Sequence, residues 1–221
     1  MSRLAIFDCD GTLVDSGAPI YAALRTSLER NGIEPPPASI SRRVIGLSLT
    51  EAMATLLPEQ PPERHLALAD DYRRAFSELR AAGQVEEPLF DGILDLLNAL
   101  VADDWQLAVA TGKSDRGLRH CLEAHGIRGR FISLQTADRH PSKPHPSMVE
   151  QAIADAGASR DTTVVIGDTS FDMAMATNAG ATGLGAGWGY HPPRELMDAG
   201  ATAVAGTPIE VVPLLRSHID G

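Results

Sequence analysis

The chain has 221 residues, of which 43% are hydrophobic and 22% charged, a composition typical of a soluble globular protein with one large domain or a core and a smaller second unit. Its formal net charge of −10 at pH 7 argues against nucleic acid and anionic membranes as main partners. Two cysteines are too few for a disulfide framework, so we expect a reduced, cytoplasmic setting. Asp8 and Asp10 interrupt the apolar stretch near the N-terminus, so we expect no signal peptide there.

Six apolar runs predict β-strands, and helical patterns lie between most of them. Apolar residues recur three and four positions apart within 93–101, 118–122 and 149–156. This alternation of strands and helices predicts an α/β fold with a doubly wound parallel sheet. The predicted strands are 4–8, 106–111, 131–136, 162–168, 181–185 and 201–205.

The alternation stops between residues 16 and 87. Helical stripes occupy 20–28, 53–57 and 66–79, and prolines punctuate them. No convincing strand pattern is found in this segment. We therefore predict an all-helical cap at 16–87, inserted after the first strand of an α/β core that comprises 1–15 and 88–221.

The segment Asp8-Cys9-Asp10-Gly11-Thr12 follows the first predicted strand. Two carboxylates two residues apart at a strand end point to the same side, into the region where open α/β sheets bind ligands. Such close carboxylates repel each other, so a cation or a shared proton is expected beside them. A solvated turn is the alternative that this motif alone leaves open.

Three further polar segments follow in order along the chain. Thr111-Gly112 ends the second predicted strand, and Lys143-Pro144 lies in a proline-stiffened loop. Asp168 ends the fourth strand, with Asp172 one helical turn later. Taken singly, Thr111 and Asp168 fit helix N-caps and Lys143 fits a solvated cation. Because functional residues collect at the strand ends of a parallel sheet, their common placement favours one shared site.

Together the four segments resemble the four ordered motifs of the haloacid dehalogenase superfamily. The resemblance is strongest to its phosphoglycolate-phosphatase-like branch, which carries a helical cap after the first strand. It extends over nearly the whole chain, and Trp188-Gly189-Tyr190 also looks like a stretch of phosphatases in that branch. The resemblance implies a Mg²⁺-dependent phosphoric monoester hydrolase that acts on a small phosphorylated metabolite through an aspartyl-phosphate.

The same resemblance implies a role for each motif residue. Asp8 is the expected nucleophile, and Asp10 is the expected acid and base, with its backbone carbonyl on the metal. Thr111 and Gly112 are expected to bind phosphoryl oxygens at a helix N-terminus. Lys143 is expected to supply positive charge to the phosphate and, with Thr111, to take part in catalysis. The expected Mg²⁺ ligands are Asp8, Asp10, Asp168 and Asp172.

The cap is expected to choose the leaving group. Arg42 and Arg43 are candidate contacts because a guanidinium binds a carboxylate or a second phosphate bidentately, and Arg43 is our predicted substrate-binding residue. The alternative is that both arginines are solvated at a helix start. Related sugar-phosphate mutases carry an arginine just after the Gly-x-Ser that Gly46-Leu47-Ser48 matches. Leu49 stands there in this chain, which weakens a mutase function.

Several functions share these motifs. We expect a phosphatase of a phosphoglycolate-like ester, and the alternatives are a phosphomutase similar to β-phosphoglucomutase or a pyrophosphatase. A metal-independent dehalogenase is disfavoured because carbon–halogen displacement needs neither Asp10 nor Asp168. A catalytically silent binding protein is disfavoured by the intact motifs. The expected partner is a small phosphorylated metabolite, with no nucleic acid and no membrane, and the expected state is a monomer or a homodimer.

Overall fold

The predicted strands form one sheet in the computed structural model, which describes residues 2–219. The strand order is β3-β2-β1-β4-β5-β6, and all neighbouring strands are parallel. β1 is therefore central and the chain winds outward from it in both directions, which confirms the doubly wound parallel sheet. The strands are β1 (Ser2–Phe7), β2 (Trp105–Thr111), β3 (Phe131–Thr136), β4 (Ala158–Gly167), β5 (Thr182–Ala186) and β6 (Ala201–Ala205).

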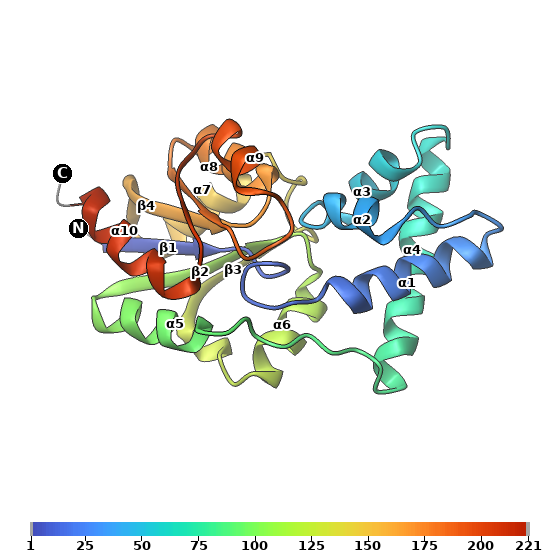
Figure 1. Cartoon of the computed structure of the whole chain (residues 1–221), viewed down its shortest axis with the longest axis horizontal. Helices are drawn as coiled ribbons and strands as arrows, with labels where there is room; N and C mark the ends of the chain where they lie inside the picture. Colours follow the sequence, from blue (N-terminus) through green and yellow to red (C-terminus); the bar gives the residue numbers. More distant parts are fainter. Residues whose placement is uncertain (1, 220–221) are drawn as a thin grey trace.

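Helices cover both faces of the sheet (Figure 1). They are α5 (Ile93–Ala102), α6 (Asp115–Ala124), η2 (Arg128–Arg130), α7 (Ser147–Ala156), α8 (Ser170–Ala179), α9 (Pro193–Asp198), η3 (Pro208–Glu210) and α10 (Val211–Ile219). Alternate residues of β1 face the two layers: Ala5 and Phe7 pack in one core with α5, α6 and α10, and Leu4 and Ile6 pack in a second core with α7 and α8. Because both faces are buried, the strand is a continuous apolar run.

The structure differs most from the predicted elements at β4, α9 and α10. β4 begins at Ala158, four residues before the predicted start at 162, because Ala158 pairs with Ser2 although the segment after it is polar. No helix was predicted at α9 or α10. The first has only six residues, and the second carries Pro213 in its first turn, so neither shows a strong helical pattern. None of the described helices is long and apolar enough to cross a membrane.

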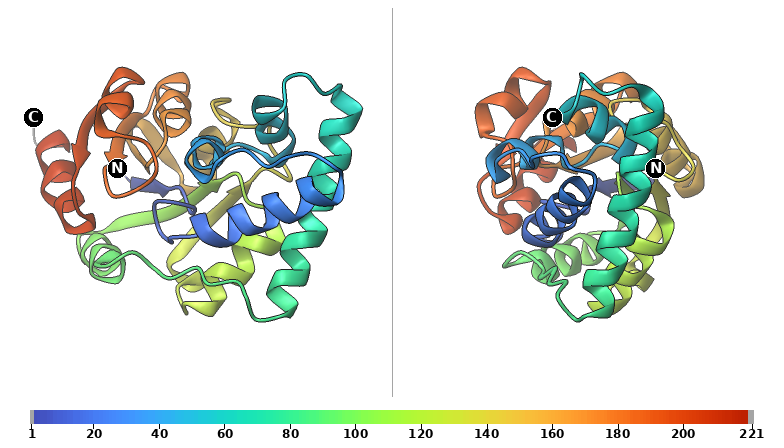
Figure 2. Two further views of the ribbon diagram at one scale, coloured as in Figure 1. Left: turned by 45° about the vertical axis from the view of Figure 1, so that its right-hand side comes forward. Right: turned by 90° about the vertical axis from the view of Figure 1, so that its right-hand side faces the viewer.

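A separate helical region lies between β1 and α5, beyond the carboxyl end of β1 (Figures 1 and 2). It consists of α1 (Gly17–Arg30), α2 (Ala38–Ser41), η1 (Arg42–Val44), α3 (Leu49–Leu56) and α4 (Pro62–Ala81). Leu24 and Leu28 of α1, Met53 of α3, and Leu68 and Tyr72 of α4 pack together in a core of their own. The apolar stripes of these helices are buried against one another, as expected for amphipathic helices.

Two paired linkers join the helical region to the sheet. The backbone N–H of Asp15 donates to the carbonyl of Pro88 at 2.9 Å, and Val14 forms an antiparallel bridge with Leu89. These pairs lie where the predicted boundaries at 15 and 88 fall. The assignment of 16–87 as a cap stays a prediction, and the paired linkers supply the place where such a unit would hinge.

Candidate functional site

Three adjacent strands carry polar residues at their carboxyl ends. β2, β1 and β4 lie side by side, and Thr111, Asp8 and Asp168 stand at or just beyond their ends, with all three side chains buried. The backbone N–H of Asp8 donates to the carbonyl of Ile166 at 2.9 Å, which continues the strand pairing past Phe7. The sheet thus brings these residues together at its topological switch point.

The turn after β1 fits closely around Asp168. Gly11 has a φ of +85°, and a Cβ there would lie 2.2 Å from Asp168 Oδ2, so only glycine fits. Thr12 Oγ1 donates to Asp168 Oδ1 at 2.7 Å, and the backbone N–H of Tyr190 donates to Oδ2 at 2.9 Å. Asp8 and Asp10 are only 1% and 6% exposed, so the segment is not a solvated turn.

A buried carboxylate cluster forms the centre of the site. Carboxylate oxygens of Asp8, Asp168 and Asp172 lie within 4.8 Å of one another. Lys143 is fully buried among them, with Nζ 2.9 Å from Asp8 Oδ1 and 2.7 Å from Asp172 Oδ1. One ammonium therefore faces a cluster of three carboxylates. The crowding predicted from the sequence was between Asp8 and Asp10, which do not share this cluster.

The charge imbalance is visible in the pKa of each group. Burial, opposed by Lys143 and reinforced by Asp172, raises the pKa of Asp8 to about 7. Burial and the neighbouring carboxylates raise the pKa of Asp168 well above its usual range. For Lys143, burial disfavours the charged form, but Asp172 and Asp8 outweigh it and raise the pKa of the ammonium. A further cation would relieve the cluster.

Asp172 accepts three hydrogen bonds, from Lys143 and Thr169. Its Oδ1 accepts from Lys143, and its Oδ2 accepts from the backbone N–H of Thr169 at 3.0 Å and from Thr169 Oγ1 at 2.7 Å. Together with Thr169 it forms a capping box at the start of α8. Asp172 therefore orients Lys143 and also caps the N-terminus of α8.

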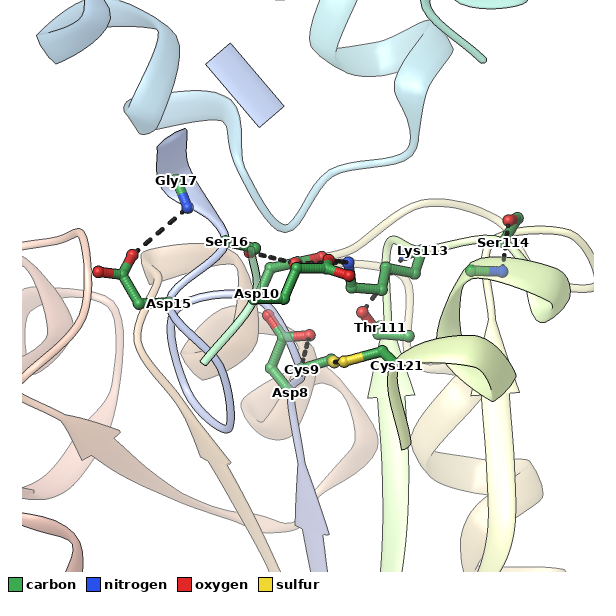
Figure 3. A network of polar contacts seen from close by, with 12 residues as sticks. Asp8, Cys9, Asp10, Asp15, Ser16, Gly17, Thr111, Lys113, Ser114 and Cys121 are labelled. Carbon is green, nitrogen blue, oxygen red and sulfur yellow. Dashed lines mark hydrogen bonds and ion pairs between the residues drawn. The ribbon is translucent and has the colours of Figure 1, made fainter. Parts of the chain in front are cut away.

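The carboxylate of Asp10 is not part of this cluster. Figure 3 shows it beside Ser16 and Lys113. Its Oδ1 accepts a hydrogen bond from Ser16 Oγ and lies 2.9 Å from Lys113 Nζ. The structure thus separates the two carboxylates of the motif: Asp8 faces Lys143 and the cluster, and Asp10 faces Lys113. Cys9 between them is buried beside Cys121, with Sγ atoms 4.0 Å apart.

Lys113 is a site residue for which we predicted no role. Its side chain is 9% exposed, and Nζ lies 2.9 Å from Asp10 Oδ1 and 2.6 Å from Glu87 Oε1. Burial disfavours the ammonium, but Asp10, Cys9 and Glu87 outweigh it and raise the pKa of Lys113 well above its ordinary value. The one sequence signal was its position directly after Thr111-Gly112. Its partner Glu87 stands in the linker that follows α4, a contact that no local pattern indicates.

Thr111 and Gly112 lie under a loop of the helical region. Thr111 Oγ1 accepts from the backbone N–H of Lys113 at 3.3 Å. A Cβ on Gly112 would lie 2.5 Å from the carbonyl oxygen of Leu47 and 2.7 Å from that of Gly46, so glycine is required for this close approach. Thr111 and Gly112 lie at the start of the loop that leads into α6. Their role in binding phosphoryl oxygens stays a prediction.

Arg43 of η1 contacts Glu195 of α9, at the exposed edge of the site. Its guanidinium forms a bidentate pair with Glu195, with N–O distances of 2.6 and 3.2 Å, and its side chain is 47% exposed. His191 Nε2 lies 3.2 Å from the carbonyl oxygen of Arg43. The structure does not place Arg43 in the carboxylate cluster. Its predicted contact with substrate would require this pair with Glu195 to open.

Comparison with known proteins identifies the family. Residues 5–186 match the family model of the haloacid dehalogenase-like hydrolases. The chain belongs to this family. A probable phosphatase, IndB, from Dickeya dadantii is 35% identical over 215 residues, which cover 96% of this chain and 93% of that protein. A phosphoglycolate phosphatase from Agrobacterium fabrum is 28% identical over 192 residues, which cover 86% and 82% of the two chains.

A solved structure agrees over the full length of this haloacid dehalogenase-like hydrolase. The crystal structure of a hydrolase from Pseudomonas syringae, 28% identical in sequence, superposes with a TM-score of 0.85 and covers 98% of this chain and 99% of that one. The predicted resemblance is confirmed. The chain is a phosphatase of the haloacid dehalogenase-like family.

The cluster of this haloacid dehalogenase-like phosphatase fits a hard divalent cation. Its donors are carboxylate oxygens, which Mg²⁺ and similar ions prefer. Asp8 Oδ2 is buried and accepts no hydrogen bond from the described residues, although a buried charged oxygen without a partner is costly. A cation beside Asp8 and Asp168 would offset the negative charge that Lys143 leaves uncompensated.

Proposed function

We propose that this phosphatase is Mg²⁺-dependent and hydrolyses a small organic phosphate monoester through an aspartyl-phosphate on Asp8. The observation that carries the proposal is the buried, unpartnered Oδ2 of Asp8 beside an ammonium and two further carboxylates. A carboxylate held in this way is a nucleophile with one free oxygen. Bound Mg²⁺, on Asp8, the Asp10 carbonyl and Asp168, would neutralise charge on the phosphoryl oxygens.

The first half-reaction transfers the phosphoryl group to the protein. Asp8 Oδ2 attacks phosphorus, the bond to the ester oxygen breaks, and Asp10 gives a proton to the departing oxygen. Lys143 holds Asp8 in place through Oδ1, which leaves Oδ2 to react. Thr111 and Gly112 would hold the phosphoryl oxygens at the start of the loop into α6.

The second half-reaction releases phosphate. Water attacks the phosphorus of the aspartyl-phosphate, its proton passes to Asp10, and the Asp8 carboxylate is restored. The contacts of Asp10 with Lys113 and Ser16 hold its carboxylate in position for both half-reactions. The loop at Gly46-Leu47, packed on Gly112, supports a cap that excludes bulk water while the ester is seated.

The setting of the enzyme is part of the proposal. Two free, buried cysteines support a reducing compartment such as the cytoplasm. The residues of the proposed mechanism all lie in one chain, which supports a monomer and is compatible with a homodimer. Leu49 in place of the mutase arginine supports hydrolysis over a phosphomutase reaction.

Release of inorganic phosphate tests the proposed function directly. A panel of phosphoglycolate, sugar phosphates, pyrophosphate, nucleotides and simple alkyl phosphates is incubated with the protein and Mg²⁺, or with EDTA. We expect release from at least one monoester with Mg²⁺ and none with EDTA. Release that survives complete chelation would overturn the metal dependence, and silence across all monoesters would overturn the phosphatase.

Mg²⁺ is expected to stabilise the protein more at about pH 8 than at about pH 6. The pKa of Asp8 is raised from 3.8 to about 7, so between these values the metal-free folded state binds more protons than the unfolded chain. Its stability therefore falls as pH rises through that interval, when a buried carboxylate ionises without a partner. Mg²⁺ competes with this proton and is favoured once Asp8 is ionised.

Thermal unfolding at both pH values, with Mg²⁺ or EDTA, measures this effect as a shift in Tm. Asp168→Asn should lose most of the Mg²⁺-induced shift. Asp15→Asn is the control because Asp15 is an exposed carboxylate in the loop that follows Asp8 and Asp10, and it should keep the shift. Equal Mg²⁺-induced shifts at the two pH values would contradict the expectation.

A further inference from the structure

A cavity of about 300 Å³ adjoins the proposed acid Asp10. It lies between the helical region and the start of α6, and Asp10, Gly112 and Lys113 contribute to its wall. The ester oxygen of a substrate must lie next to Asp10 to receive its proton. The leaving group would therefore extend into this cavity. The side chains that line the cavity then indicate the chemical class of that group.

The walls of the cavity are largely apolar. They are formed by Ile20, Leu24, Met53, Leu56, Tyr72 and Phe76, from the inner sides of α1, α3 and α4. Tyr72 and Phe76 lie with their ring centroids 5.9 Å apart. Leu49, at the position of the mutase arginine, also lines the cavity, so an apolar side chain stands where the mutases place a cation.

The cations around the cavity are mostly neutralised by the protein. Lys113 pairs with Asp10 and Glu87, and Arg73 pairs with Asp70 at 2.5 Å. Arg80 pairs with the same Glu87 at 3.0 Å, although its buried Nε has no hydrogen-bond partner among the described residues. Of the lining cations within residues 2–219, only Arg116 forms no ion pair, and it is exposed. A carboxylate close to the ester oxygen, as in phosphoglycolate, would meet apolar side chains and an already paired lysine.

We propose that the leaving group is an apolar, ring-sized alcohol, so that the substrate class is hydrophobic phosphate monoesters; this inference rests on the proposed phosphatase function. Glycolate would leave most of the cavity without contacts and would place a carboxylate against apolar walls, both of which cost affinity. An apolar body buries its surface against α1, α3 and α4. Each added methylene is expected to raise kcat/KM about fourfold until the cavity is filled.

A series of primary-alcohol phosphates tests the inference, because the leaving alcohols are similar in acidity and differ in the size of their apolar part. Ethyl, butyl, cyclohexylmethyl and 3-phenylpropyl phosphate are compared with phosphoglycolate by phosphate release with Mg²⁺. We expect kcat/KM to rise by about 100-fold or more from ethyl to the ring-containing esters, with phosphoglycolate among the poorest. A flat or falling series overturns the inference and leaves the phosphatase intact.

A substitution that fills the cavity provides the second readout. Ala52 of α3 lines the cavity, and Ala52→Phe should lower kcat/KM for 3-phenylpropyl phosphate about tenfold or more while ethyl phosphate changes by about twofold or less. Thr55→Phe is the matched control, since Thr55 is exposed on the same helix, and it should change neither. Equal effects of Ala52→Phe on both esters would overturn the inference.

Binding of phosphonates separates the two proposals. Ethylphosphonate and 3-phenylpropylphosphonate carry the same headgroup but are not hydrolysed, and calorimetry with Mg²⁺ measures their affinities without turnover. Tighter binding of the 3-phenylpropyl compound supports the apolar cavity even where no ester is hydrolysed, an outcome that would overturn the phosphatase alone. Equal affinities overturn the inference whatever the activity.

Discussion

Asp8→Asn is expected to reduce Mg²⁺-dependent phosphate release by on the order of 10⁴-fold or more. The amide has no anionic oxygen to attack phosphorus, so the aspartyl-phosphate cannot form. The substitution keeps the shape of the side chain and removes one charge from a buried cluster in which three carboxylates share one ammonium. Lys143 keeps its contact with Asp172, so the variant should fold.

Two measurements separate loss of the nucleophile from loss of the fold. The Tm of Asp8→Asn in EDTA should equal or exceed that of the wild type, because an uncompensated buried charge has been removed. Acid-quenched wild-type enzyme should carry a phosphate on the peptide that contains Asp8, and the variant should carry none. Asp15→Asn, in the same loop, should retain activity within about twofold. More than a few per cent of wild-type turnover in Asp8→Asn would exclude the covalent mechanism.

Asp10→Asn is expected to lower kcat for an alkyl phosphate by about 10²- to 10⁴-fold. An alkoxide is a poor leaving group without a proton, and the variant has no acid to supply it. Hydrolysis of the aspartyl-phosphate should slow as well, because the same carboxylate accepts the proton of the attacking water. The structure favours folding of this variant, since Lys113 keeps its ion pair with Glu87 at 2.6 Å.

An ester with a good leaving group distinguishes these two steps. Nitrophenolate departs without protonation, so Asp10→Asn should still transfer phosphate from p-nitrophenyl phosphate to Asp8. The slow second step should then produce a burst of nitrophenolate equal to the enzyme concentration, followed by a low steady rate. The rapid-mixing time course measures both phases. Equal losses on alkyl and nitrophenyl esters, without a burst, would assign Asp10 a structural role only.

Much of the fold follows from local patterns in the chain. The apolar runs at 4–8 and 162–168 predicted strands because a strand covered on both faces must be apolar throughout. The strand-end rule then placed Asp8, Thr111 and Asp168 at one edge, and the structure brings them there. Lys143 and Asp172 were placed with this set from the order of the polar segments, and the family resemblance gave them their roles. Lys143 lies against both Asp8 and Asp172.

Other features depend on contacts between segments far apart in sequence. The orientation of the Asp10 carboxylate toward Lys113, rather than toward the cluster around Asp8, was not foreseen, and it depends on Glu87 in the linker after α4. The pair of Arg43 with Glu195 spans 152 positions, so no periodicity predicts it. Long-range ion pairs are decided by how helices pack, which single-sequence patterns do not encode.

The amino-acid sequence by itself determined the sheet, the helical insertion and the kind of chemistry, because strand burial, helix periodicity and the identity of carboxylate, hydroxyl and ammonium groups are local properties. Tertiary structure alone decided which oxygen of Asp8 is free, which cation Asp10 faces and what lines the cavity beside it. Packing of α1, α3 and α4 over the strand ends creates that cavity, and its apolar wall exists only once these helices are brought together.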